Sequence, residues 1–306
     1  MRLNDLDLYN KYLNTKIRNT INKSLKENNF IFGNSVKKLE EKLSEFSGSK
    51  YTITVGSGTD ALLLSLMCLD LKSGDEVVLT GCRVGEIYPG GYSQFVKVKS
   101  ELLVKKPKTI SSKDSMILGT AGFTSLLCAF AIKAREDLFL GEKINEVLVT
   151  GATGGVGCIS IMVLTKMGYK VTAVTGKKDK NDFLKKLGAK TIIDRKELES
   201  ESRPLDKGIW DGVVDTVGGK ILAKAISHTK PNGIVAACGL AADYKLNTTV
   251  MPFIIRGVKL WGINSVNIST IRRNFLWSEA SKLIDFDLLN NSVKEISLDE
   301  VLDIYP

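Results

Sequence analysis

The second half of the chain alternates between short apolar segments and longer segments whose apolar residues recur at helical spacing. The short segments predict strands at residues 147–150, 170–174, 191–193, 212–215, 233–237 and 258–262. The longer segments predict helices at residues 159–167, 181–187 and 220–227. Strands that alternate with helices are typical of a parallel sheet covered by helices. We therefore predict a doubly wound α/β domain.

The first 145 residues follow a less regular pattern. Ile17, Ile21 and Leu25 recur at helical spacing, and a second helix is predicted after Asn34. Further predictions are a strand at 51–55, a helix at 61–69, a strand at 76–80, antiparallel strands at 92–98 and 101–105, and a long apolar helix capped at 111–114. The end of the chain is predicted to be helical, with 296–301 as a candidate extended segment.

Composition indicates an ordinary core-forming protein, with 43% hydrophobic and 25% charged residues. No run of about 18 apolar residues is evident, so we expect no membrane span. The first seven residues lack the apolar stretch of a signal peptide. We therefore predict a cytoplasmic protein that has no membrane partner.

The net charge is +9, from 43 Lys and Arg against 34 Asp and Glu residues. Because the lysines are scattered rather than clustered with aromatic residues, we expect no nucleic-acid partner. The five cysteines are Cys68, Cys82, Cys128, Cys158 and Cys238. They form no C-x-x-C pair, and His228 is the single histidine. A structural zinc site needs about four such ligands at short spacing, so no metal site is expected.

Residues 152–157, Ala-Thr-Gly-Gly-Val-Gly, follow a predicted strand and open a predicted helix. This A-x-G-x-x-G spacing is one substitution from the dinucleotide-binding fingerprint. Gly154 lets the backbone approach a pyrophosphate, Gly157 lets the helix pack on the strand, and the helix N-terminus offers free N–H groups. We therefore predict a dinucleotide site. The alternative is a tight turn that binds nothing.

The next predicted strand ends at Thr175-Gly176-Lys177-Lys178. NAD sites usually carry Asp or Glu at this point, about 20 residues after the glycine turn, to bind the ribose 2′-hydroxyl. Lysine and hydroxyl donors suit a 2′-phosphate instead. We therefore predict NADPH as the cofactor. The alternative for the two lysines is a solvated helix start.

Several motifs in order give the chain from about residue 77 a family resemblance. They are Gly119-Thr-Ala-Gly-Phe-Thr124, Thr150-Gly-Ala-Thr-Gly-Gly-Val-Gly157, Asp215-Thr-Val-Gly218, Ala236-Ala-Cys-Gly-Leu-Ala241 and Thr248-Thr-Val-Met-Pro-Phe-Ile254. This part resembles the zinc-independent medium-chain dehydrogenase/reductases, and among them the quinone oxidoreductase-like group that includes acryloyl-CoA reductases. The resemblance implies a Rossmann NADPH-binding domain and no zinc.

The resemblance also implies which residues contact the cofactor, although it identifies no catalytic residue. The implied contacts are Thr120, Thr153, Gly154, Gly155, Val156, Thr175, Gly176, Lys177, Arg195, Leu240 and Ser265. Thr120, Leu240 and Ser265 are expected near the nicotinamide. Alternatively, Thr120 is only a helix N-cap and Ser265 only a turn residue.

The first 78 residues resemble a different family. Gly33 to Glu40, Val55 to Leu62 and Gly74 to Val77 are similar to the start of DegT-type, PLP-dependent sugar aminotransferases. In that family, the turn equivalent to residues 58–60 holds the PLP phosphate. The Schiff-base lysine lies further along that family's chain than this resemblance extends, so PLP chemistry is not expected.

The two resemblances imply a composite chain, produced by a fusion or by an assembly error near residues 74–78. We expect an aminotransferase-like α/β fragment at 1–78, a truncated GroES-like β remnant at 79–115, a Rossmann domain at 116–264, and a truncated return segment at 265–306. The lost part of the barrel is expected to impair catalysis, because hydride transfer needs close positioning and excluded water.

Three functions follow, in order of preference. The first is NADPH-dependent reduction of the C=C bond of an α,β-unsaturated carbonyl compound, of the acryloyl-CoA or quinone/enone class. The second is a non-catalytic NADPH-binding fusion remnant, and the third a PLP-dependent aminotransferase. A small-molecule substrate and a homodimer are expected from the resemblance.

Overall fold

The computed structural model describes residues 17–23, 25–26, 34–50, 52–55, 71, 73–88, 90, 95–138, 143–297 and 300. The chain separates into two compact units, Met1–Cys68 and Leu69–Pro306. The predicted helix at 61–69 and the aminotransferase-like turn at 58–60 lie outside the described residues.

Helix α2, Asn34–Ser47, confirms the helix predicted in the N-terminal unit. Thr54 donates its backbone N–H and its hydroxyl to Oε1 of Glu40, at 2.8 and 2.9 Å. These two hydrogen bonds hold the pKa of Glu40 below its usual value. Residues 52–55 are not a strand. The strand prediction is therefore wrong there, because no other described strand pairs with this segment.

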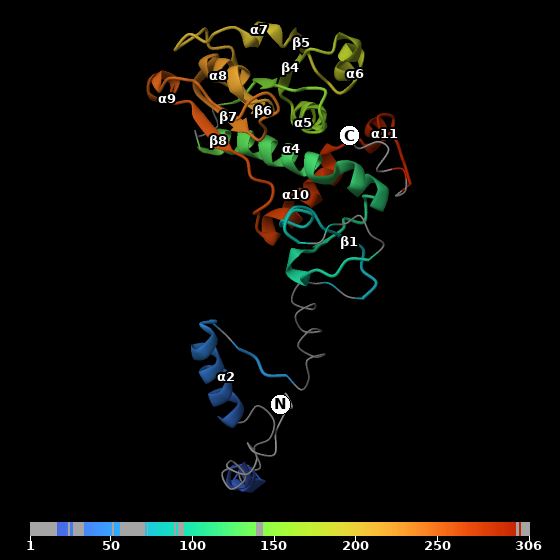
Figure 1. Cartoon of the computed structure of the whole chain (residues 1–306), viewed down its shortest axis with the longest axis vertical. Helices are drawn as coiled ribbons and strands as arrows, with labels where there is room; N and C mark the ends of the chain where they lie inside the picture. Colours follow the sequence, from blue (N-terminus) through green and yellow to red (C-terminus); the bar gives the residue numbers. More distant parts are fainter. Residues whose placement is uncertain are drawn as a thin grey trace. The chain divides into compact units, whose positions relative to one another are not determined.

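Six parallel strands form the sheet of the larger unit (Figure 1). They are β3 (Glu146–Val149), β4 (Lys170–Thr175), β5 (Thr191–Asp194), β6 (Trp210–Asp215), β7 (Thr229–Ala237) and β8 (Lys259–Gly262). Their order is β5-β4-β3-β6-β7-β8, and every neighbouring pair is parallel. This confirms the doubly wound α/β prediction, with the strand order reversing beside β3.

Helices cover both faces of the sheet. The helices of this unit are α4 (Ser112–Leu138), α5 (Gly155–Lys166), α6 (Asn181–Lys186), α7 (Lys196–Glu199), α8 (Gly219–Ser227), α9 (Met251–Arg256), α10 (Thr270–Leu283) and α11 (Phe286–Asn290). Val147 and Val149 of β3 join the core cluster formed with α4 and α5, whereas Leu148 joins the cluster formed with α8. This alternation follows from the two-residue period of a strand. In Figure 1, α4 runs along one face while α7 and α8 lie over the other.

Helix α4 is long and apolar enough, by length and composition, to cross a membrane. The expectation that no such run exists is therefore wrong. In this fold 67% of its most apolar window is buried, so it has the character of a core helix. Gly119 interrupts the helix, with φ 48° and ψ −152°, a conformation that side chains disfavour.

The segment that was predicted to be a GroES-like remnant contains less strand than its alternating sequence predicts. β1 (Val77–Val78) pairs antiparallel with β2 (Val104–Lys105). Residues 95–99 have no regular structure, and Ser100–Leu102 is a 3-10 helix. The predicted strands at 92–98 and 101–105 are thus wrong over most of their described length. Phe95 is 89% exposed, so the apolar residues that produced the pattern have no sheet face to bury them.

The end of the chain is helical in α10 and α11, as expected. Residues 296–297 are not extended strand, and the rest of the candidate segment, apart from Glu300, lies outside the described residues.

Leu126→Ala on α4 should destabilise the larger unit by about 2–5 kcal/mol, because it empties a fully buried position. Leu138→Ala, on the same helix but 68% exposed, is the control and should change stability by less than about 0.5 kcal/mol. Urea unfolding measures both. Equal effects of the two substitutions would contradict the assignment of α4 to the core.

Candidate cofactor site

The candidate site lies where the parallel strands end. The last residues of β3, β4 and β6 lead into loops at the carboxyl edge of the sheet, beside the point where the strand order reverses. In open α/β sheets, ligands bind in the crevice at this edge.

The glycine turn after β3 is tightly closed. Gly151 has φ 58°, and the N–H of Gly154 donates to the carbonyl of Gly151 at 2.9 Å. A Cβ at Gly157 would lie 2.3 Å from the Gly151 oxygen and 2.8 Å from Cα of Ala152. Since both neighbours are backbone atoms, no side chain fits at Gly157. The glycine therefore allows α5 to begin directly against the end of β3.

The N-terminus of α5 is open to an anion. Gly154 is its N-cap residue, and no side chain caps the helix. Cys158 is the first residue of α5 whose N–H donates a hydrogen bond to a backbone carbonyl, and that carbonyl belongs to Gly154. The preceding N–H groups and the positive end of the helix dipole suit a pyrophosphate. Gly154 and Gly155 are also exposed, so these residues fit a dinucleotide.

A buried hydrogen-bond network supports the glycine turn. The hydroxyl of Thr150 donates to Asp215 at 2.7 Å, and the N–H of Gly218 donates to the other carboxylate oxygen at 2.8 Å. Thr216 donates its N–H to the Thr150 hydroxyl and its own hydroxyl to the Thr150 carbonyl. Burial raises the pKa of Asp215, and the hydrogen bonds from Thr150 and Gly218 oppose that rise. The network fixes the loops after β3 and β6 relative to each other.

A cavity of about 550 Å³ extends from the glycine turn past the end of β4. Its lining comes from the loops after β3, β4, β6 and β7 and from the end of β5 with α7. The lining residues are Gly151, Thr153, Val174, Thr175, Gly176, Lys177, Lys178, Asp194, Arg195, Lys196, Glu199, Val217, Ile221, Ala241 and Ala242. Five predicted cofactor contacts, those at 153, 175, 176, 177 and 195, therefore share this one cavity.

The cavity carries four cationic and two anionic side chains, a surplus of two positive charges. Arg195 lies against Gly176, where a Cβ would approach its Cδ to 3.0 Å. Its Nε is 3.2 Å from Glu199, but both side chains are largely exposed, so this pair is weak. The Thr175 hydroxyl accepts a hydrogen bond from the N–H of Lys177. A phosphate bound here would have several hydrogen-bond donors around it, and the end of β4 contributes no carboxylate.

Two of the other predicted contacts adjoin this region. Thr120 follows the break in α4 at Gly119, and a Cβ at Gly155 would lie 3.1 Å from Cβ of the next residue, Ala121. Leu240 is 66% exposed and precedes two residues that line the cavity. All eleven residues, those that share the cavity included, remain predictions as cofactor contacts.

Ser265 belongs to a different set of contacts. Its carbonyl accepts a hydrogen bond from Nη2 of Arg273 at 3.2 Å, and it does not line the cavity at the end of β4. Arg273 is 1% exposed. Sequence analysis missed it, because an arginine on the polar-looking helix α10 carries no signal that distinguishes a buried guanidinium from a surface one.

Apart from Arg195, the cavity residues at the end of β5 and on α7 were not predicted from the sequence. Asp194, Lys196 and Glu199 reach the cavity only because β5 pairs with β4. The pairing of β5 with β4 is a feature of the tertiary structure, although the usual strand order of a doubly wound sheet could have suggested it.

Two family profiles match the chain. The family described as zinc-binding dehydrogenase matches residues 155–282. The DegT/DnrJ/EryC1/StrS aminotransferase family matches residues 11–83. Both resemblances inferred from the motifs are confirmed. Among the described residues, no three His, Cys, Asp or Glu side chains gather as a potential metal site.

Individual proteins match over most of the chain. The acrylyl-CoA reductase of Ruegeria pomeroyi is 43% identical over 75% of this chain and 69% of its own length. The yhdH oxidoreductase of Salmonella enterica, solved in complex with NADP, is 43% identical with a TM-score of 0.73, over 76% of this chain and 71% of its own. Bacillus subtilis yhfP, solved with NAD bound, is 39% identical with a TM-score of 0.72 over the same shares.

The fold and the glycine turn define a dinucleotide-binding α/β protein. The chain belongs to the zinc-independent medium-chain dehydrogenase/reductase family, alongside the acrylyl-CoA reductases and quinone oxidoreductase homologues. By family it is an oxidoreductase.

Proposed function

We propose that the chain is an NADPH-dependent reductase of the C=C bond of α,β-unsaturated carbonyl compounds, of the acryloyl-CoA or quinone/enone class. The observation that carries this proposal is the cationic cavity at the end of β4, which adjoins the glycine turn. The acrylyl-CoA reductase of Ruegeria pomeroyi and the NADP complex of the Salmonella enterica protein support it.

Each group of predicted contacts has a role in this proposal. Thr153, Gly154, Gly155 and Val156 hold the pyrophosphate with backbone N–H groups at the start of α5. The 2′-phosphate binds Thr175, Gly176, Lys177 and Arg195, and the nicotinamide end lies near Thr120, Leu240 and Ser265. When bound, NADPH supplies a hydride for the β-carbon of the substrate.

The cofactor preference needs its own test, since the Bacillus subtilis relative is solved with NAD. Lys177→Ala should weaken NADPH binding roughly tenfold or more, because a charge-assisted hydrogen bond contributes about 1.5–3 kcal/mol. NADH binding should stay unchanged, since NADH has no 2′-phosphate. Fluorescence titration measures both affinities. Lys166→Ala, an exposed lysine in the last turn of α5 outside the cavity, is the control. An equal effect on the two cofactors would contradict the assignment.

The composite character of the chain favours a second candidate, a fusion remnant that binds NADPH without turnover. Residues 11–83 match an aminotransferase family, so only the later part of a GroES-like domain, at 79–115, is left to cover the nicotinamide. We propose the domain boundaries at residues 78, 115 and 264 on this basis.

A PLP-dependent aminotransferase is the third candidate, and it would require an absorbance band from PLP bound to a lysine.

Purified protein should bind NADPH and should oxidise it when acryloyl-CoA, an enone or a quinone is added. Titration by fluorescence measures binding, and the loss of NADPH absorbance measures turnover. Binding with turnover supports the reductase. Tight binding without turnover of any of these substrates selects the remnant, and the absence of binding rejects both.

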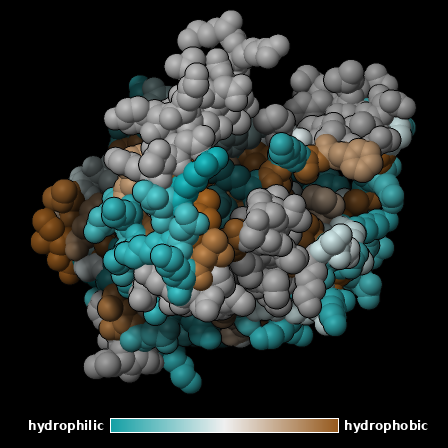
Figure 2. Space-filling model, turned by 90° about the horizontal axis from the view of Figure 1, so that it is seen from below, coloured by the Kyte–Doolittle hydropathy of each residue, from teal (hydrophilic) through white to brown (hydrophobic). Residues whose placement is uncertain are grey.

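We propose that two copies of the chain form a cytoplasmic homodimer through the edge strand β8. Leu260 and Trp261 are 39% and 43% exposed, and Ile254 on the preceding helix is 76% exposed. In the face that Figure 2 views, apolar residues reach the surface beside hydrophilic ones. An exposed apolar edge strand favours pairing with a copy of itself, which closes under twofold symmetry.

Analytical ultracentrifugation should give a dimer for the wild-type chain and a monomer for Ile254→Lys with Trp261→Lys. The control is Ile271→Lys, which places the same charge at an isoleucine that is 85% exposed on α10. A monomeric wild-type chain, or dissociation by the control, would contradict the proposal.

A further inference from the structure

Two cysteine side chains meet between α4 and the end of β7. Cys128 lies on α4 and is fully buried, whereas Cys238 directly follows β7 and is partly exposed. Helix α4 packs against β7, and Cys238 packs against the core cluster that contains Cys128. The two thiols are joined by a hydrogen bond. Neither cysteine is among the predicted cofactor contacts.

The pair lies beside the contacts that support the glycine turn. The N–H of Cys238 donates to the carbonyl of Asp215 at 2.9 Å, and its Sγ lies 3.4 Å from the same oxygen. Three residues before Cys128 on α4, the Ser125 hydroxyl donates to the carbonyl of Val156 in the first turn of α5, at 2.8 Å. Both cysteines therefore lie on backbone that is fixed in the core, and their sulfur atoms face each other without a loop movement.

The two thiols differ in how easily they ionise. The hydrogen bond from Cys128 lowers the pKa of Cys238, while burial and the carboxylate of Asp215 oppose this shift. The hydrogen bond with Cys238, together with burial, raises the pKa of Cys128 well above its usual value. The thiolate is the reactive form of cysteine. Cys238, which is also the more exposed of the two, is therefore the thiol that reacts first with an oxidant.

We propose that Cys128 and Cys238 form a redox modification site, which hydrogen peroxide converts into an intramolecular disulfide. The Cys238 thiolate attacks one peroxide oxygen, the O–O bond breaks and hydroxide leaves, which gives a sulfenic acid. The Cys128 sulfur then attacks the Cys238 sulfur, and the S–O bond breaks as the S–S bond forms and water leaves. The two thiols lose two electrons in total, the peroxide gains them, and both thiol protons end in water.

The disulfide would join two parts of the larger unit that are distant in sequence. It would tie the middle of α4 to the loop after β7, and Ala241 and Ala242 of that loop line the cavity at the end of β4. The modification therefore lies next to the candidate cofactor site, although its formation does not require a bound cofactor.

Cys158 provides a matched comparison within the same unit. It is partly exposed, like Cys238. Its Sγ donates to the carbonyl of Gly155 at 3.3 Å, and burial raises its pKa. A thiol of this kind should react more slowly with peroxide than Cys238, because less of it is ionised.

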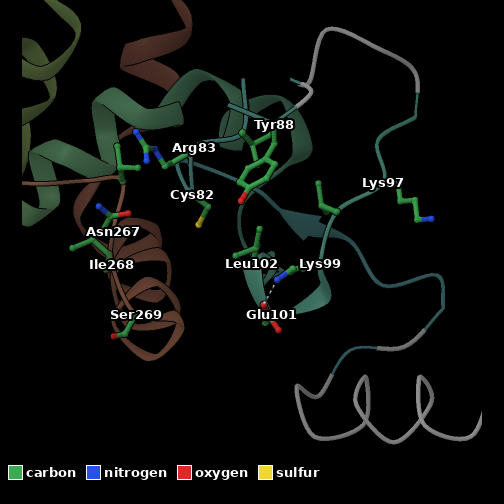
Figure 3. A pocket seen from close by; sticks show the side chains of 13 residues that line it. Cys82, Arg83, Tyr88, Lys97, Lys99, Glu101, Leu102, Asn267, Ile268 and Ser269 are labelled. Carbon is green, nitrogen blue, oxygen red and sulfur yellow. Dashed lines mark ion pairs between the residues drawn. The ribbon is translucent and has the colours of Figure 1, made fainter. Parts of the chain in front are cut away.

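Cys82 provides a second comparison, because it lies on the wall of a second cavity, of about 630 Å³. The segment after β1 and the loop after β8 form this cavity. The buried Arg273 joins them, since it donates to the carbonyl and hydroxyl of Thr80 and to the carbonyls of Ser265 and Val266. In Figure 3, the Cys82 side chain lies among the lining residues. The charged lining residues, with a surplus of two positive charges, are Arg83, Lys97, Lys99 and Glu101.

Peptide mapping by mass spectrometry, after hydrogen peroxide is added to the folded full-length chain, tests the proposal. A cross-link between the peptides of Cys128 and Cys238 should form at least tenfold faster than Cys158 is oxidised, and dithiothreitol should reverse it. Cys128→Ser should leave Cys238 as a sulfenic acid that dimedone labels, whereas Cys238→Ser should leave Cys128 unmodified. Cys82→Ser and Cys158→Ser are the controls and should leave the cross-link unchanged.

Mapping of the wild-type chain decides the proposal without any substitution, and thermal melting checks that each variant is folded. Oxidation of Cys82 without a cross-link between Cys128 and Cys238 would show that the pair only fills the core, and would overturn the proposal. Dimedone labelling of Cys128 in place of Cys238, or a cross-link that involves Cys158, would also overturn it. Since no readout requires NADPH or turnover, these outcomes are independent of the proposed reductase.

Discussion

The larger unit depends on how closely the backbone of α5 approaches the end of β3. Gly157 lies so near Gly151 and Ala152 that a single additional carbon would overlap backbone atoms. This contact lets the helix start directly at the strand end and leaves its first N–H groups uncapped. The buried Thr150–Asp215 hydrogen bond then fixes the adjoining loop of β6. Anion binding at the sheet edge follows from these constraints.

Two cationic cavities lie at the ends of different strands, and different contacts stabilise the walls of each cavity. The pairing of β4 with β5 brings Arg195 over Gly176 and forms the first. A buried arginine, Arg273, binds the carbonyls around the second. Because this guanidinium donates to five oxygen atoms, four of them backbone carbonyls, it acts as a fixed cross-link between the segment after β1 and the loop after β8. Part of the surplus positive charge of the chain therefore lies in these two cavities.

Sequence patterns predicted the sheet well, because buried parallel strands produce apolar runs. They also predicted the glycine turn, because the backbone geometry of the turn restricts which residues it can contain. They failed in residues 95–103, which alternate in sequence although 95–99 have no regular structure and Ser100–Leu102 is a 3-10 helix. They also missed Arg273, whose burial depends on carbonyls far away in the sequence. The glycine turn and the donors at 175, 176 and 177 were predicted from their position after two strands, and Arg195 was implied by the family resemblance. Their gathering in one cavity depends on the strand order, which no local pattern contains.

We expect the carboxyl edge of this sheet to bind NADPH through the glycine turn and the lysines after β4. A crystal structure of the chain with NADPH would test this binding mode. The pyrophosphate should lie at the N-terminus of α5 and the 2′-phosphate against Thr175, Lys177 and Arg195. A 2′-phosphate directed into solvent, or a dinucleotide bound elsewhere on the chain, would contradict it.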